Sequence, residues 1–139
     1  MRYTVEATIA RPVEEVFAFC SDLRNELRWN PSAIEIAKLT EGNLRVGTRF
    51  RASWRNAPTT LVEVVEYSPP SSWTTHARSM GMEVRFGGRL TAFDDRTRYV
   101  AEVDVQPRGV AVLWAWLAVR TMRRQEPENL RRIKVALEG

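Results

Sequence analysis

The fold is decided by residues 3–20, YTVEATIARPVEEVFAFC, together with the motif Trp29-Asn30-Pro31. Residues 3–9 alternate apolar and polar side chains, as a half-buried strand does. Proline is tolerated in the first turn of a helix, and the helix dipole stabilises acidic residues there, so the run RPVEE predicts a helix over Val13–Cys20. Ser21 or Asp22 can cap a second short helix that ends at the Trp-Asn-Pro motif.

The middle of the chain continues with the two-residue period of antiparallel strands. Gly-rich, Asn-containing and Pro-containing turns separate the apolar and polar alternations, because these residues favour turns and proline cannot donate to a ladder. Together with residues 3–9 the pattern predicts seven strands; the further six are Ile34–Ile36, Thr48–Trp54, Thr60–Tyr67, Trp73–Arg78, Met82–Phe93 and Arg98–Val105.

From about Gly109 to Glu138 the period becomes helical and predicts one long C-terminal helix. Its apolar stripe would contain Val112, Trp116, Val119, Glu126, Leu130, Ile133 and Leu137. Pro127 lies inside this helix and is expected to kink or break it, because its ring clashes with the preceding turn. The alternation and the helix together predict an α+β sheet packed on a helix.

The stretch from Ala10 to Phe17, with Ser21-Asp22 and Trp29-Asn30-Pro31, resembles the SRPBCC (START-like) superfamily, in particular its polyketide cyclase/dehydrase-like branch. The resemblance spans nearly the whole chain. It implies a helix-grip fold, in which a curved seven-stranded antiparallel sheet wraps around the C-terminal helix, with two short helices between strands 1 and 2 and a cavity between sheet and helix. We expect residues 1–139 to form a single domain of this kind.

Composition narrows the classes of function. The chain is 44% hydrophobic and 27% charged, which disfavours disorder and integral membrane association. The polar, alternating N-terminus does not resemble a signal peptide, so a cytoplasmic location is expected. The net charge of +4 comes mostly from arginines interspersed with acids. We therefore expect no nucleic-acid partner and a solvated basic face on the last helix.

Every second side chain along a strand points to the same face of the sheet, and on these strands one such set is apolar and is expected to face inward. Residues expected to line an apolar, ligand-binding or lipid-binding pocket are Phe50, Trp54, Trp73, Met82 and Phe86 from the strands and Trp116 from the helix. Trp29 joins them because the resemblance places a tryptophan of this motif at the cavity mouth. The alternative is that these side chains form a filled core with no pocket.

Few inward residues could move protons. Tyr67, Tyr99 and Glu126 are the inward candidates, although a kink at Pro127 would turn Glu126 outward. The parity of the sole histidine, His76, points it to solvent unless a bulge reverses it. A single histidine and the absence of a His, Cys and carboxylate cluster predict no metal site, and no cofactor is expected. Cys20 is interpreted as a small buried thiol without a catalytic role.

Three functions fit these features, and the sequence leaves open whether the protein is an enzyme. The first is binding of a hydrophobic or aromatic small molecule. The second is an aromatic polyketide cyclase or dehydratase that uses the same cavity, with Tyr67, His76, Tyr99 or Glu126 moving protons. The third is a protein-interaction module like the co-chaperone members of the superfamily.

Residues 110–119 are an unbroken run of ten apolar residues, too uniform for a helix with one wet face and too short to span a bilayer. Trp114 and Trp116 would lie about 200° apart around a helix, so if Trp116 faces the sheet, Trp114 points away from it. We expect a homodimer contact here, with membrane docking during ligand transfer as the lesser alternative. Cover by loops of the same chain is the remaining interpretation.

Overall fold

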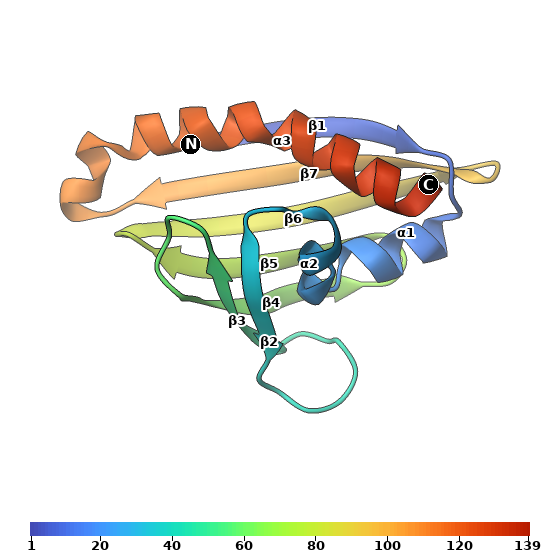
Figure 1. Ribbon diagram of the computed structural model, residues 1–139, viewed down its shortest axis with the longest axis horizontal. Coiled ribbons are helices and arrows are strands. Elements are labelled where there is room, and N and C mark those ends of the chain that lie inside the picture. The colour runs from blue at the N-terminus through green and yellow to red at the C-terminus, as the bar shows by residue number, and fades with distance from the viewer.

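The computed structural model describes residues 1–139 and places three helices on one side of a single curved sheet (Figure 1). The strands are β1 (Arg2–Ile9), β2 (Ala33–Lys38), β3 (Arg49–Trp54), β4 (Thr60–Ser68), β5 (Ser72–Ser79), β6 (Met82–Phe93) and β7 (Arg96–Pro107). The helices are α1 (Val13–Cys20), α2 (Glu26–Trp29) and α3 (Ala115–Glu138), with short 3-10 helices η1 (Leu23–Asn25) and η2 (Gly109–Leu113).

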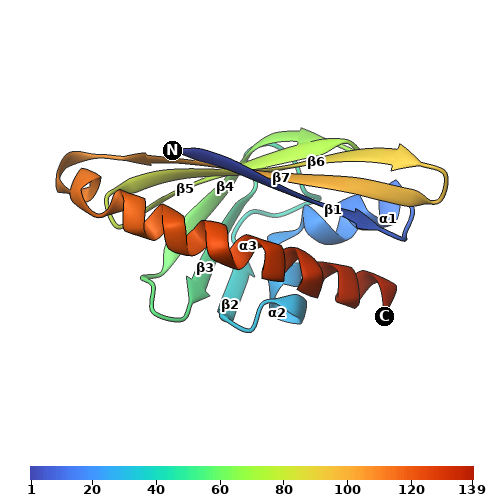
Figure 2. The same ribbon diagram turned by 90° about the horizontal axis from the view of Figure 1, so that it is seen from above.

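The seven strands form one antiparallel sheet in the order β1-β7-β6-β5-β4-β3-β2. Seen from above, α3 crosses one face of the sheet and β2 and β3 turn toward it (Figure 2). Register shifts between Ala33 and Glu35 and between Val64 and Glu66 mark irregular pairing in the strands that bend. This is the predicted helix-grip fold, and the fold prediction is confirmed.

The connection from β1 into α1 also holds the end of α3. The carbonyl of Pro12 accepts hydrogen bonds from the amides of Glu15 and Val16, which starts α1. Arg11 Nε donates to the carbonyl of Leu137 at 2.8 Å, and the amide of Ala10 donates to Glu138 Oε2 at 2.9 Å. These bonds satisfy a carbonyl of the last turn of α3, which would otherwise lack a helical partner.

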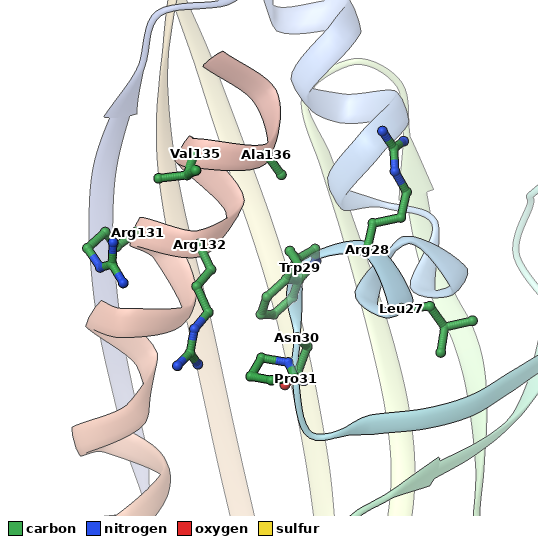
Figure 3. Close-up of a pocket in the computed structure, with 9 residues that line it drawn as sticks. All are labelled: Leu27, Arg28, Trp29, Asn30, Pro31, Arg131, Arg132, Val135 and Ala136. Carbon is green, nitrogen blue, oxygen red and sulfur yellow. The ribbon is translucent and has the colours of Figure 1, made fainter. Parts of the chain in front are cut away.

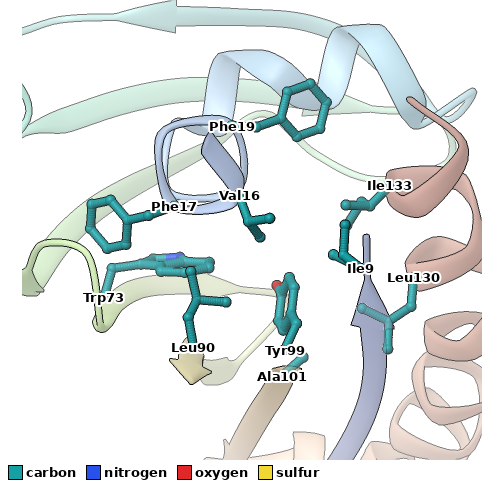
Figure 4. Close-up of a cluster of buried hydrophobic side chains, with 10 residues drawn as sticks. All are labelled: Ile9, Val16, Phe17, Phe19, Trp73, Leu90, Tyr99, Ala101, Leu130 and Ile133. Carbon is teal, nitrogen blue, oxygen red and sulfur yellow. The ribbon is translucent and has the colours of Figure 1, made fainter. Parts of the chain in front are cut away.

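The largest group of buried hydrophobic side chains joins α1, the sheet and the second half of α3 (Figure 4). Its aromatic centre is Trp73, which meets Phe17 and Tyr99 edge to face with ring centroids 5.6 and 5.8 Å apart. The ring of Trp73 lies against Gly88 on β6, where a Cβ atom would overlap it. Gly88 is therefore glycine because Trp73 lies flat on its strand.

The opposite face of the sheet carries cross-strand ion pairs. Arg49 pairs with Glu63 at 3.2 Å, Arg78 with Glu83 at 2.9 Å and Arg89 with Glu102 at 3.8 Å. His76 lies on this face, in register with Glu63 on β4 and Arg85 on β6. The irregular pairing between Val64 and Glu66 on β4 does not turn His76 toward the helix side of the sheet.

The start of the C-terminal helix differs from the sequence prediction. Residues 109–113 form a 3-10 helix, and Trp114, with φ −119° and ψ −2°, separates it from α3. The change of helix type resets the phase, so Ala111 and Ala115 are buried while Val112 and Trp116 are 55% and 54% exposed. The predicted placement of Val112 and Trp116 on the buried stripe is wrong.

Of the kink or break expected at Pro127, the break does not occur, because helix α3 continues through this residue. None of the helices is both long enough and apolar enough to cross a membrane. Six large apolar side chains of η2, of Trp114 and of the first turn of α3 are exposed. We call them the tryptophan patch: Val110, Val112, Leu113, Trp114, Trp116 and Leu117.

Candidate functional site

A pocket of about 420 Å³ lies between the sheet, the α1–α2 segment and the middle of α3. Its walls are mainly apolar, with five aromatic side chains among the lining residues: Trp29, Trp54, Trp73, Phe86 and Tyr99. Strands β4 and β5 contribute the smaller side chains Val62, Thr75 and Ala77. The volume falls within the range of small-molecule sites.

The Trp-Asn-Pro motif positions an acid in this pocket. Asn30, which follows α2, donates from Nδ2 to Glu26 Oε1 at 2.8 Å, and its Oδ1 accepts from the amide of Ser32 at 3.0 Å. Trp54 on β3 donates from Nε1 to the same Glu26 oxygen at 3.1 Å. Burial raises the pKa of Glu26 above its usual range, although both hydrogen bonds favour the charged form.

A second acid enters the pocket from α3. Glu126 lines the pocket directly before Pro127, so the proline does not turn this carboxyl outward. Burial, and next the negative charge of Glu26, raise the pKa of Glu126 to about 7, while the nearby amide of Asn129 opposes the shift. Glu126 can therefore gain or lose a proton near neutral pH.

The neutral polar groups of the lining include Ser21, Tyr99 and Cys20. Ser21 is buried, and its Oγ has no hydrogen-bond partner. Burial raises the pKa of Tyr99 well above its usual range and that of Cys20 to about 12. The Cys20 thiol therefore stays protonated at neutral pH and is not a nucleophile.

The structure brings together six of the eleven residues that the sequence indicated for binding or catalysis. Trp29, Trp54, Trp73, Phe86, Tyr99 and Glu126 all line the pocket. Phe50 and Met82 are buried in separate hydrophobic clusters, and Trp116 is exposed in the tryptophan patch. Tyr67 packs on Phe17 at 5.4 Å between ring centroids, and His76 lies on the far face of the sheet.

Trp29 also lines a groove of about 470 Å³ on the outer surface, between α2 and the end of α3 (Figure 3). Arg131 and Arg132 line the α3 side of this groove, and both pair with Glu128. Trp29 thus lines both the pocket and this groove.

Sequence reasoning missed Glu26. The alternation of inward and outward side chains applies only to strands, and Glu26 lies on a four-residue helix between two strands. One signal was available: Glu26 precedes Asn30 by four residues, a spacing at which two helical side chains meet. The structure nowhere gathers three or more His, Cys, Asp or Glu side chains that could hold a metal ion.

Comparisons with solved structures agree with the helix-grip class. The structure of Ara h 8.0201 matches with a TM-score of 0.74 and 17% identity, over 100% of this chain and 99% of that one. A hypothetical protein from Helicobacter pylori matches with a TM-score of 0.78 and 16% identity, over 99% and 88%. The Zhui aromatase/cyclase from a Streptomyces species matches with a TM-score of 0.70 and 14% identity, over 99% and 90%.

At these identities the solved structures show a common fold and no more. The sequence identifies the family, because the protein-family model described as polyketide cyclase / dehydrase and lipid transport matches residues 1–138. The chain belongs to this family. No curated protein matches it in sequence.

Proposed function

We propose that the protein binds a hydrophobic or aromatic small molecule in the pocket between the sheet and α3. The observation that carries the proposal is the pocket of about 420 Å³ with five aromatic side chains in its walls. Aromatic walls with a few convergent polar groups are typical of small-molecule sites. The family description, which includes lipid transport, also supports a hydrophobic ligand.

Binding is tested with a panel of aromatic polyketides, flavonoids and fatty acids, using tryptophan emission, melting temperature and native mass spectrometry. Trp29, Trp54 and Trp73 line the pocket, so an occupying ligand should change the emission. The variant Ala77→Phe fills the pocket from β5 and should lose binding. Leu61→Phe, at a position 62% exposed on β4, is the matched control and should bind as wild type does. A panel without any effect on the wild-type protein would reject the pocket proposal.

An enzymatic function, aromatic polyketide cyclisation with dehydration, is favoured by one observation. Glu126 has a pKa of about 7 beside a pocket that also contains Tyr99. As a base, Glu126 would take a proton from a methylene carbon between two ketones. That carbon would attack another ketone carbon of the same chain, and Glu126 would return its proton to the new alkoxide. Glu126 would then take the second proton of the former methylene carbon, and the hydroxyl would leave with that proton as water.

For the enzymatic test we propose the two candidates that line the pocket, Tyr99 and Glu126. If the protein is a cyclase, Glu126→Gln or Tyr99→Phe should lower turnover by about a hundredfold. Tyr67→Phe and His76→Gln are controls, because neither residue lines the pocket. Equal activity in all four variants would leave binding and shaping of the substrate as the only contribution of the pocket.

We also propose that the tryptophan patch is a homodimer contact. Its six exposed apolar side chains lie in eight consecutive residues, a density that is typical of an interface. A twofold axis near Leu117 would set Arg120 of each copy beside Trp114 of the other, an arrangement that favours a cation–π contact. Sedimentation should show a dimer for wild type and a monomer for Trp114→Glu. A monomer in both cases would reject the contact, and liposome binding would point to a membrane instead.

A further inference from the structure

The charge inside the pocket is opposite to the charge of the molecule. The protein has 21 basic and 17 acidic residues, yet the only charged side chains lining the pocket are Asp22, Glu26 and Glu126. Asp22 is paired with Arg24 at 2.8 Å. Glu26 and Glu126 have no basic partner. Ionised carboxyls without a cation are disfavoured in an apolar pocket, so each either holds a proton, as the raised pKa values of both residues indicate, or binds a positively charged group.

The two carboxyls have unused capacity for a ligand. Both hydrogen bonds to Glu26 end on Oε1, from Asn30 and Trp54, and none ends on Oε2. An ionised carboxylate can accept about four hydrogen bonds, so Glu26 retains a free acceptor oxygen. Glu26 and Glu126 are close enough for the charge of Glu26 to act on Glu126.

The aromatic part of the pocket lining also favours a positively charged ligand group. The rings of Trp29, Trp54 and Trp73 supply the aromatic faces on which cations bind.

We propose that the ligand is an aromatic or apolar molecule that carries a protonated amine, and that the amine binds between Glu26 and Glu126. This inference rests on the proposed binding function and specifies its ligand class. An ammonium group can donate hydrogen bonds to both carboxyls, and its single positive charge compensates one carboxylate while the other can hold a proton. A carboxylate ligand such as a fatty acid would instead add a like charge, which the pocket disfavours.

The test uses three matched probes that differ in one group: naphthylethylamine, naphthylethanol and naphthylpropionate. Isothermal titration calorimetry at pH 8 should show that the amine binds at least about tenfold tighter than the alcohol, as expected for a charge-assisted hydrogen bond. The propionate should bind weakest. Equal binding of all three would overturn the amine inference and leave the binding function standing. If none binds and the broader panel also fails, both are overturned.

Variants identify the carboxyls responsible. Glu126→Gln and Glu26→Gln keep the side-chain shape and should reduce the preference for amine over alcohol to about twofold or less, because the charge-assisted bond is lost. Circular dichroism and the melting temperature show that each variant is folded, and the effect is read from the ratio of amine affinity to alcohol affinity. Glu128→Gln removes an acid two positions away that does not line the pocket, and it should keep the full preference. A preference that survives in both pocket variants would overturn the assignment to these residues.

The pH profile gives an independent readout. Glu126 is ionised above about pH 7, so affinity for the amine should rise from pH 6 to pH 8 while affinity for the alcohol stays flat. The titratable groups around Glu126 are Glu26 from α2, Asp22 and Cys20 from the α1–η1 segment, Tyr99 from β7, Tyr3 from β1 and Arg123 from α3. The Cys20 thiol and the two phenols have raised pKa values and stay neutral across this range. A flat amine profile would contradict the role given to Glu126.

Discussion

At the scale of single residues, the pocket depends on groups whose surroundings change their chemistry. Glu126 is an ordinary glutamate in sequence, and it becomes a group that titrates near neutral pH because it is buried beside Glu26. Gly88 is an ordinary strand glycine in sequence, and it is required because the ring of Trp73 occupies the place of a side chain. Both residues can be tested by single substitutions.

The raised pKa of Glu126 predicts how stability depends on pH. In the unfolded chain Glu126 ionises near its usual value, whereas in the folded protein it holds its proton up to about pH 7. Between these values the folded state binds more protons, so the free energy of unfolding should fall as pH rises from about 5 to about 8. Glu126→Gln should flatten this fall and be more stable than wild type by about 1–3 kcal/mol at pH 8.

Urea unfolding of both proteins at pH 5 and pH 8 measures the effect. Glu128→Gln is the control, because Glu128 lies on the same helix outside the pocket, and its profile should run parallel to that of wild type. Parallel profiles for Glu126→Gln and wild type would contradict the burial of an ionisable carboxyl in the pocket.

The contact between Gly88 and Trp73 predicts a large cost for one methyl group. Gly88→Ala should force the Trp73 ring off β6 and lower the free energy of unfolding by about 1–3 kcal/mol, the usual cost of overpacking. The emission of Trp73 should shift as well. Gly87→Ala is the neighbouring control, where the new Cβ would lie 3.2 Å from Thr74 Oγ1, and it should cost less. Equal losses in the two variants would show that the ring does not require Gly88.

At the scale of elements, the strands were predictable and the phase of the last helix was not. Alternation over residues such as Arg98–Val105 follows from a sheet with one buried face, so a two-residue period finds it. In residues 110–119 every side chain is apolar, so no periodicity indicates which ones face the sheet. The deciding feature is the small size of Ala111 and Ala115, which lets the backbone approach the sheet and leaves the tryptophans outside.

This corrected phase predicts opposite responses at adjacent positions. Ala115 is fully buried against a cluster that includes Tyr3, Met82 and Val103, so Ala115→Leu should cost about 1–3 kcal/mol of stability. Trp116→Ala, at a position 54% exposed, should change stability by less than about 0.5 kcal/mol when measured at concentrations where the protein is a monomer. Chemical denaturation measures both. A larger loss for Trp116→Ala would restore the phase that the sequence pattern indicated.

The candidate site was predictable only where a residue belonged to a periodic element or a motif. Trp54, Trp73 and Phe86 follow from strand parity, and Trp29 follows from the family motif. Glu26 could not be found by parity, since its role arises from Asn30 and from Trp54, which is distant in sequence. Phe50 has the right parity but lies in the hydrophobic cluster with Ile36 and Val62, because parity does not tell a pocket wall from a filled core.

At the scale of the whole molecule, residues near the two ends of the chain hold the helix on the sheet. Arg11, just after β1, donates to the carbonyls of Leu137 and Glu138 at 2.8 and 3.4 Å. Arg11→Ala should lower the free energy of unfolding by about 1 kcal/mol and should speed hydrogen exchange in the last turns of α3. Arg2→Ala removes an exposed ion pair with Asp104 and serves as the control. Unchanged exchange in Arg11→Ala would show that packing alone holds the helix end.

The sheet order also fixes when each strand can pair during synthesis. From β3 to β7 each strand lies beside the one made just before it, so these strands and β2 can pair as they emerge. Strand β1 is made before all of them, and its only neighbour is β7, whose first residue is Arg96. Until then Arg2–Ile9 remains an unpaired strand, which is a target for chaperones and for aggregation. The pocket forms later still, because Glu126, Leu130 and Ile133 on α3 are the last of its walls to be synthesised.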